Sequence, residues 1–119
     1  MAITIKIKRA YEPFDKMDGF RVLVDRLWPR GVTKKDAHID LWMKDIAPSI
    51  ALRKWFNHEP EKWEAFSKSY RAELKKSGAV DELIEYATEK KTVTLIYAGK
   101  DEKHTHALVL LHYVTTLLK

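Results

Sequence analysis

The chain contains no cysteine among its 119 residues. This absence excludes disulfide bonds, cysteine nucleophiles and thiolate metal sites, and it fits the reducing cytoplasm, where we expect the protein to reside. No apolar stretch approaches the roughly 20 residues that cross a bilayer. Residues 1–9 also lack the apolar block of a signal peptide. We therefore expect no membrane partner.

Several catalytic signatures are also missing. No Gly-Lys-Ser or Gly-Lys-Thr closes a glycine-led loop, so the Walker loop is absent. Ser49 lacks the Gly-x-Ser-x-Gly context of a hydrolase nucleophile. The rings of His104 and His106 would point about 200° apart on a helix; in a loop, they could chelate a metal with Asp101 as third ligand. We favour structural roles for the two histidines and predict neither a metal nor a cofactor.

The composition is that of a globular protein with a basic balance. Hydrophobic residues make up 45% of the chain and charged residues 33%. The length suffices for one core, so we expect a single domain over residues 1–119. There are 22 Lys and Arg against 17 Asp and Glu, a formal charge of +5. This excess favours anionic partners without naming one.

The apolar pattern predicts strands alternating with helices. Strand patterns cover residues 3–8, 20–24, 38–43 and 92–97. Helical patterns cover residues 49–56, where Ser49 can cap, and then 60–78, 80–89 and about 103–118. This alternation predicts an α/β fold, with three layers and a mainly parallel sheet of about four strands flanked by helices.

A charged turn follows the second strand, at residues 25–31. Arg26 and Arg30 each offer a planar fork of donors that matches phosphate or carboxylate oxygens. Pro29 restricts the turn and would reduce the entropy lost on binding a ligand. The alternative is structural, with Asp25 pairing with either arginine inside the turn.

A second charged turn joins the last strand to the last helix. Gly99 allows a ligand close to the backbone, and Lys100 adds a charge beside the unpaired N–H groups of a helix start. We expect Asp101 to cap that helix; an acid or base role beside a cleft is the alternative. His106 would donate to a loop carbonyl or, alternatively, contact a ligand.

The two turns together predict a small-molecule site at the carboxyl ends of the strands. We expect the ligand to carry phosphate or carboxylate. The residues expected to hold it are Arg26, Arg30, Lys100, Asp101 and Trp42, the last because it is out of phase with its apolar neighbours. If the site is catalytic, Asp25 and His106 are the expected acid and base, for hydrolysis or group transfer at a phosphoryl centre.

The alternative function is a non-enzymatic module that binds nucleic acid or another protein through a basic surface. Its support is the positive charge outside the proposed site, at Lys34, Lys35, Lys54, Lys90 and Lys91. A third hypothesis is a homodimer that pairs exposed helix faces and binds no small ligand.

Four segments resemble the YeaO-like branch of the domain-of-unknown-function 488 family, at residues 21–31, 41–49, 52–58 and 97–107. The resemblance implies a compact bacterial or archaeal α/β domain and brings no catalytic residues with it. Members of the wider family often carry a cysteine in the segment similar to residues 97–107. Because Tyr97 and Thr105 stand in this segment, a thiol mechanism would not apply to this chain.

Overall fold

A four-stranded parallel sheet forms the centre of the computed structural model, which describes residues 2–118. The strands are β1 (Thr4–Arg9), β2 (Phe20–Leu23), β3 (Leu41–Trp42) and β4 (Thr92–Tyr97). They lie in the order β1-β4-β2-β3, and each neighbouring pair is parallel. The predicted parallel sheet of about four strands is confirmed.

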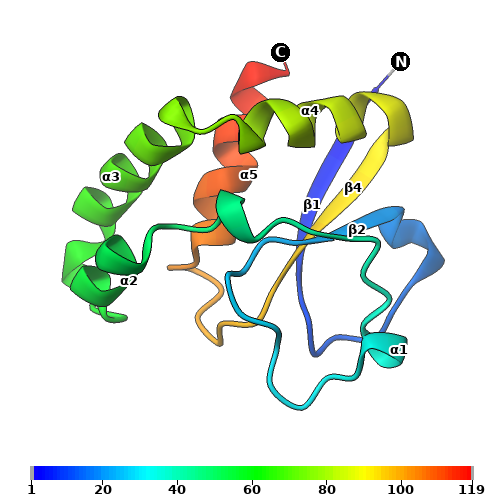
Figure 1. The fold of residues 1–119 in the computed structure, drawn as a ribbon, viewed down its shortest axis with the longest axis horizontal. Coiled ribbons are helices and arrows are strands. Elements are labelled where there is room, and N and C mark those ends of the chain that lie inside the picture. The colour runs from blue at the N-terminus through cyan, green and yellow to red at the C-terminus, as the bar shows by residue number, and fades with distance from the viewer. Residues whose placement is uncertain (1, 119) are drawn as a thin grey trace.

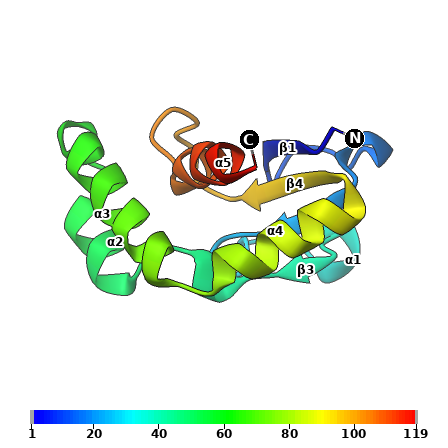
Figure 2. The same ribbon diagram turned by 90° about the horizontal axis from the view of Figure 1, so that it is seen from above.

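Helices cover both faces of the sheet (Figure 2). On one face, α5 (His106–Leu117) packs against β1 and β4, and on the other α4 (Ala79–Lys90) packs against β4. This confirms the predicted three layers. A pair of helices, α2 (Ile50–Phe56) and α3 (Trp63–Lys76), extends beside the sheet, where α3 also packs on α5 (Figure 1). The short α1 (Lys34–Ala37) follows β2 and precedes β3 along the chain.

No helix in the described part of the chain has the length and apolar character to span a membrane.

The central strands are buried on both faces, as their continuous apolar runs predict. Residues 22–24 and 93–97 are almost inaccessible to solvent. The predicted strand at residues 38–43 is shorter in the structure. The N–H of Arg21 donates to the side chain of Asp40 (2.8 Å) instead of a main-chain carbonyl, so regular pairing begins only at Leu41.

Side-chain caps fix where two of the helices begin. Ser49 caps α2, as predicted, because its hydroxyl accepts the N–H of Leu52 (3.1 Å). The last helix begins at His106, later than predicted, and its cap is Thr105. The expectation that Asp101 caps this helix is wrong. Its carboxylate accepts N–H groups of the preceding turn, and this turn keeps residues 101–104 out of the helix.

A buried ion pair ties the sheet to the loops at its amino end. Arg21 is 1% exposed and donates to the Asp18 carboxylate and to the carbonyls of Ala37 (3.0 Å) and His38 (3.1 Å). Lys8 of β1 also contacts Asp18, at 3.0 Å. Burial alone raises the pKa of Asp18, but hydrogen bonds from Lys8, the Asp15 N–H and Arg21 outweigh it and hold that pKa below its usual value.

Replacing Asp18 should therefore destabilise the protein in a pH-dependent way. Asp18→Asn leaves the buried Arg21 without its counter-charge, and we expect the free energy of unfolding to fall by about 3 kcal/mol at neutral pH. The lowered folded-state pKa means that this contribution is complete above about pH 4 and is lost as the pH falls through the folded value. Urea unfolding at a series of pH values measures both effects.

Glu85→Gln, an exposed carboxylate on α4, is the matched control and should be neutral. A difference between Asp18→Asn and the parent protein that stays constant down to acid pH would contradict the role assigned to the Asp18 charge.

Candidate functional site

A cavity of about 330 Å³ opens where β2 and β4 end. The chain leaves these neighbouring strands toward opposite faces of the sheet, since β4 leads to α5 and β2 leads to α1, β3 and onward to α4 (Figures 1 and 2). This divergence produces a crevice at the carboxyl edge of an open parallel sheet. The two charged turns, residues 47–48 and α2 form its walls.

Six of the seven predicted site residues line this one cavity, namely Asp25, Arg26, Arg30, Lys100, Asp101 and His106. The prediction that both charged turns contribute to one pocket wall is thus confirmed. The exception is Trp42, which lines a different cavity beside β3. Its indole N–H donates to the carbonyl of Asp25 (2.7 Å), so Trp42 supports the first turn from outside the site. Out of phase with its apolar neighbours, Trp42 could have faced either a second layer or the cleft, and it does not line this cavity.

Asp25 joins the two turns. One carboxylate oxygen, Oδ2, accepts the N–H of Ala98, which directly follows β4 (2.9 Å). The other, Oδ1, lies 3.1 Å from Nε2 of His106, at the start of α5. The carboxylate therefore connects the end of β2 to the end of β4 and to the last helix, which sets the shape of the cavity.

The contacts of His106 decide its tautomer. Nε2 lies 3.0 Å from the carbonyl oxygen of Val24, and a carbonyl can only accept, so the neutral ring carries its hydrogen on Nε2. That N–H is aimed at Val24, and the buried Asp25 Oδ1, although 3.1 Å from Nε2, has no hydrogen-bond partner within residues 2–118. The predicted donation from His106 to a loop carbonyl is confirmed. The ring also packs edge-on against Tyr70, with the centroids 6.0 Å apart.

Aromatic side chains close the inner wall behind His106. Phe56 and Phe66 are stacked with their centroids 4.4 Å apart, and both line the cavity. Tyr70 is buried behind them and donates its hydroxyl to the carbonyl of Ile46 (2.6 Å). Burial raises the pKa of this phenol, and the carboxylates of Glu73 and Asp25 add to the effect. Tyr70 therefore stays protonated and structural.

The cationic side chains of the cavity differ in their accessibility. Arg26 is half-buried, and its Nη2 lies 3.4 Å from the carbonyl oxygen of Ala47 and 3.3 Å from that of Pro48. By contrast, Arg30, Arg53 and Lys100 are exposed, and within residues 2–118 none of these three forms an ion pair.

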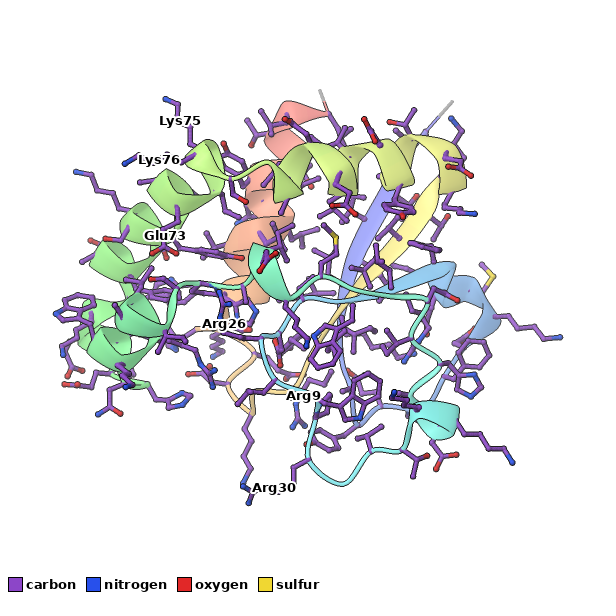
Figure 3. All side chains as sticks on the ribbon, in the orientation of Figure 1. Arg9, Arg26, Arg30, Glu73, Lys75 and Lys76 are labelled. Carbon is purple, nitrogen blue, oxygen red and sulfur yellow. The ribbon has the colours of Figure 1, made fainter. Side chains whose placement is uncertain are left out.

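The two arginines of the first turn do not converge on one point. Figure 3 shows Arg26 in the interior beside α2 and the start of α5, and Arg30 at the outer edge of the molecule. The prediction that two forks from one stiff turn grip a ligand together therefore needs revision. Arg26 supports residues 47–48, whereas Arg30, Arg53 and Lys100 line the cavity as exposed side chains.

Asp101 organises its own turn. Its Oδ1 accepts the N–H groups of Lys103 and His104, and its Oδ2 lies 2.8 Å from Nδ1 of His104. The hydrogen bond with His104 is the main cause that lowers the pKa of Asp101. His104 in turn packs edge-on against Trp63 (5.4 Å). With its oxygens engaged in this way, the carboxylate is not available to hold an anion, which its charge would also repel.

Sequence reasoning missed two residues that hold the cavity open. Arg9, at the end of β1, donates to the carbonyls of Gly99 (2.9 Å) and Ala98 (3.2 Å). Its guanidinium lies over the ring of Tyr11 (5.2 Å), whose hydroxyl donates to the carbonyl of Arg30 (2.9 Å). Arg9 follows the rule that polar residues at strand ends build sites, so its position at the end of a predicted strand was an available signal.

The chemistry of the lining is limited. Hydroxyl groups come from Tyr11 and Thr105, and both are engaged, the first with Arg30 and the second as the cap of α5. In the described part of the chain, no three His, Cys, Asp or Glu side chains lie close enough together to hold a metal ion. The lining carries four cationic side chains (Arg26, Arg30, Arg53 and Lys100) against the carboxylates of Asp25 and Asp101.

Asp25→Asn should show whether this carboxylate fixes the site. In the variant, an amide NH₂ group replaces one carboxylate oxygen. If it faces Ala98 it meets the N–H of Ala98, and if it faces His106 it meets the Nε2–H group, so in either orientation two donors lie opposite each other. We expect the free energy of unfolding to fall by about 1 to 3 kcal/mol. Denaturant unfolding measures it, with the exposed Asp45→Asn as the matched control. Equal stability of the two variants would contradict the joining role of Asp25.

Comparison with known proteins places the chain in a family. A family model described as the inactive DUF488-N3 subclade matches residues 4–119. The uncharacterized protein YeaO of Escherichia coli strain K12 is 40% identical over 115 residues, which cover 97% of this chain and 100% of that protein. An uncharacterized protein of Mycobacterium tuberculosis strain H37Rv is 42% identical over 106 residues, or 89% of each chain.

No solved structure matches the chain significantly. The family match spans almost the whole sequence, and the resemblance of residues 21–107 to the YeaO-like branch is confirmed by it. The chain belongs to the inactive DUF488-N3 subclade.

Proposed function

We propose that this protein binds a small phosphate- or carboxylate-bearing molecule in the cavity between the two charged turns and does not transform it. The observation that carries the proposal is the set of three exposed cations, Arg30, Arg53 and Lys100, that line one concave site without a carboxylate partner in residues 2–118. Guanidinium and ammonium groups that no acid neutralises are the usual partners of phosphate and carboxylate oxygens.

Two further features support an anionic ligand of modest size. The twelve-residue α5 begins at the cavity, so the positive end of its dipole lies at the site. The volume of about 330 Å³ is at the lower end of the range for small-molecule sites. Because Arg9 and Tyr11 hold both turns in place, little ordering is needed when a ligand binds.

Binding without turnover agrees with the chemistry of the lining. A covalent mechanism needs a nucleophile within reach of a base. The hydroxyl groups of Tyr11 and Thr105 are engaged elsewhere, and the chain has no cysteine. Asp25 and His106, the expected acid and base, hold the two turns together through Ala98 and Val24. The description of the subclade as inactive supports the same conclusion.

Removing one exposed cation should weaken anion binding without unfolding the protein. We expect Lys100→Ala to raise the dissociation constant for inorganic phosphate about tenfold, since a charged hydrogen bond contributes about 1.5 kcal/mol or more. The free energy of unfolding should change by less than about 0.5 kcal/mol because the side chain is exposed. Titration calorimetry and denaturant unfolding measure the two quantities.

Lys35→Ala removes the same charge from α1, outside the cavity, and should leave phosphate binding unchanged. Two results would refute the proposed site: equal weakening by the two variants, or no detectable phosphate binding by the parent protein at low ionic strength.

A further inference from the structure

The outer face of α3 carries a row of cations that has no part in the cavity. Lys68, Arg71 and Lys75 follow one another at intervals of three and four residues, and all three are exposed. At 100° and 1.5 Å per residue they fall within about 60° of the helix circumference and about 10 Å of its length. The buried residues of α3, such as Tyr70, occupy the opposite side. Lys76, also exposed, lies about 100° around the helix from Lys75 and so beside the row, not on it.

Glu73, two residues after Arg71 on α3, is directed away from this row. Glu73 accepts the N–H of Ser49 with Oε1 (2.9 Å) and the Ser49 hydroxyl with Oε2 (2.6 Å). Figure 3 shows the result: Glu73 reaches inward across the segment before α2, whereas Lys75 and Lys76 point away from the molecule. The exposed charged side chains in the second half of α3 are therefore all cationic.

Local neutralisation does not explain the row. In the described part of the chain, no ion pair involves Lys68, Arg71, Lys75 or Lys76. Glu64 is on the same face but lies in the first turn of α3, where the helix dipole stabilises a carboxylate. The dipole likewise stabilises the positive charges of Lys75 and Lys76 in the last turn. Lys68 and Arg71 lie before that turn, so the dipole does not account for them.

We propose that the outer face of α3 binds the phosphate backbone of a nucleic acid. A length of about 10 Å corresponds to about three nucleotides of one strand at 3.4 Å each, so the cations can meet successive phosphates. Extended polyanions suit an exposed row, whereas a small anion suits the cavity. The helix projects beside the sheet (Figures 1 and 2), which leaves this face open along its length.

The lysines that first supported nucleic-acid binding are dispersed in the structure. Lys34 and Lys35 lie on α1, Lys54 on α2, and Lys90 and Lys91 at the end of α4. These elements are at different places in the fold (Figure 1). The net positive charge of the chain is thus not gathered by these five lysines into one surface. The proposal rests on the row of α3 alone.

The test compares two triple variants with equal loss of charge. Lys68→Gln, Arg71→Gln and Lys75→Gln are combined in one protein, and Lys16→Gln, Lys34→Gln and Lys35→Gln in the control. Labelled single-stranded and duplex oligonucleotides of mixed sequence are titrated by fluorescence anisotropy at several salt concentrations between about 50 and 200 mM. Thermal unfolding of each variant verifies that it is folded.

We expect the α3 variant to bind at least tenfold more weakly than the parent, for whichever form of nucleic acid binds more tightly. Its slope of log affinity against log salt should fall by about 2 to 3, because each lost phosphate contact removes about 0.7 to 0.9. The control should retain most of the parent affinity. Equal losses in the two variants, or no binding of either nucleic acid by the parent at the lowest salt, would overturn the proposal.

The cavity and the row are separable in this design. Lys100→Ala should leave oligonucleotide affinity unchanged, and the α3 triple variant should bind inorganic phosphate like the parent. A failure of one proposal therefore leaves the other to be decided on its own measurement.

Discussion

The carboxylate of Asp25 is the contact on which the candidate site depends. It accepts the Ala98 N–H after β4 and lies beside the His106 ring at the start of α5, while its own carbonyl accepts the indole N–H of Trp42. Asp25, Trp42 and residues 98–106, which are distant in the sequence, therefore meet at one place. The chain segments that follow β2 and β4 leave the sheet toward opposite faces. The contacts of Asp25 join these segments and give the crevice between them a fixed shape.

Around that contact, the cationic side chains fall into two groups, those bonded to the main chain and those that are exposed. Arg9 and Arg26 spend their donors on backbone carbonyls of the cavity walls. Arg30, Arg53 and Lys100 remain exposed at the same cavity. Guanidinium groups thus occur in two settings at one cavity, either bonded to main-chain carbonyls or exposed. A similar distinction applies to α3, where Glu73 accepts hydrogen bonds from Ser49, the cap of α2, and lies turned away from the exposed cations of the same helix.

Much of the fold could be predicted because it follows from local rules. Continuous apolar runs became central strands, and Ser49 became a cap. The helical pattern at residues 60–78 became α3, whose buried face carries Phe66, Tyr70 and Leu74. The convergence of residues 25–31 and 98–106 was also predictable, since both turns follow parallel strands. These inferences needed only periodicity and the known geometry of α/β sheets.

The predictions that were wrong or missing concern side chains whose hydrogen-bond partners lie far away in the sequence, or for which the sequence allows more than one partner. Asp101 was expected to cap the last helix, and only the fold shows that Thr105 is the cap of α5. Trp42 was out of phase with its neighbours, but the sequence does not say that its indole would reach the Asp25 carbonyl. The buried contact of Arg21 with Asp18 and the bracing by Arg9 each join segments through tertiary structure, so spacing along the chain gave no direct sign of either.

The most direct measurement of the central claim is a crystal structure of the protein grown in sulfate or phosphate. The geometry predicts an ordered anion in the cavity, within hydrogen-bond distance of at least two of Arg30, Arg53 and Lys100 and near the start of α5. Ordered anions bound elsewhere on the surface, with this cavity occupied only by water, would contradict it.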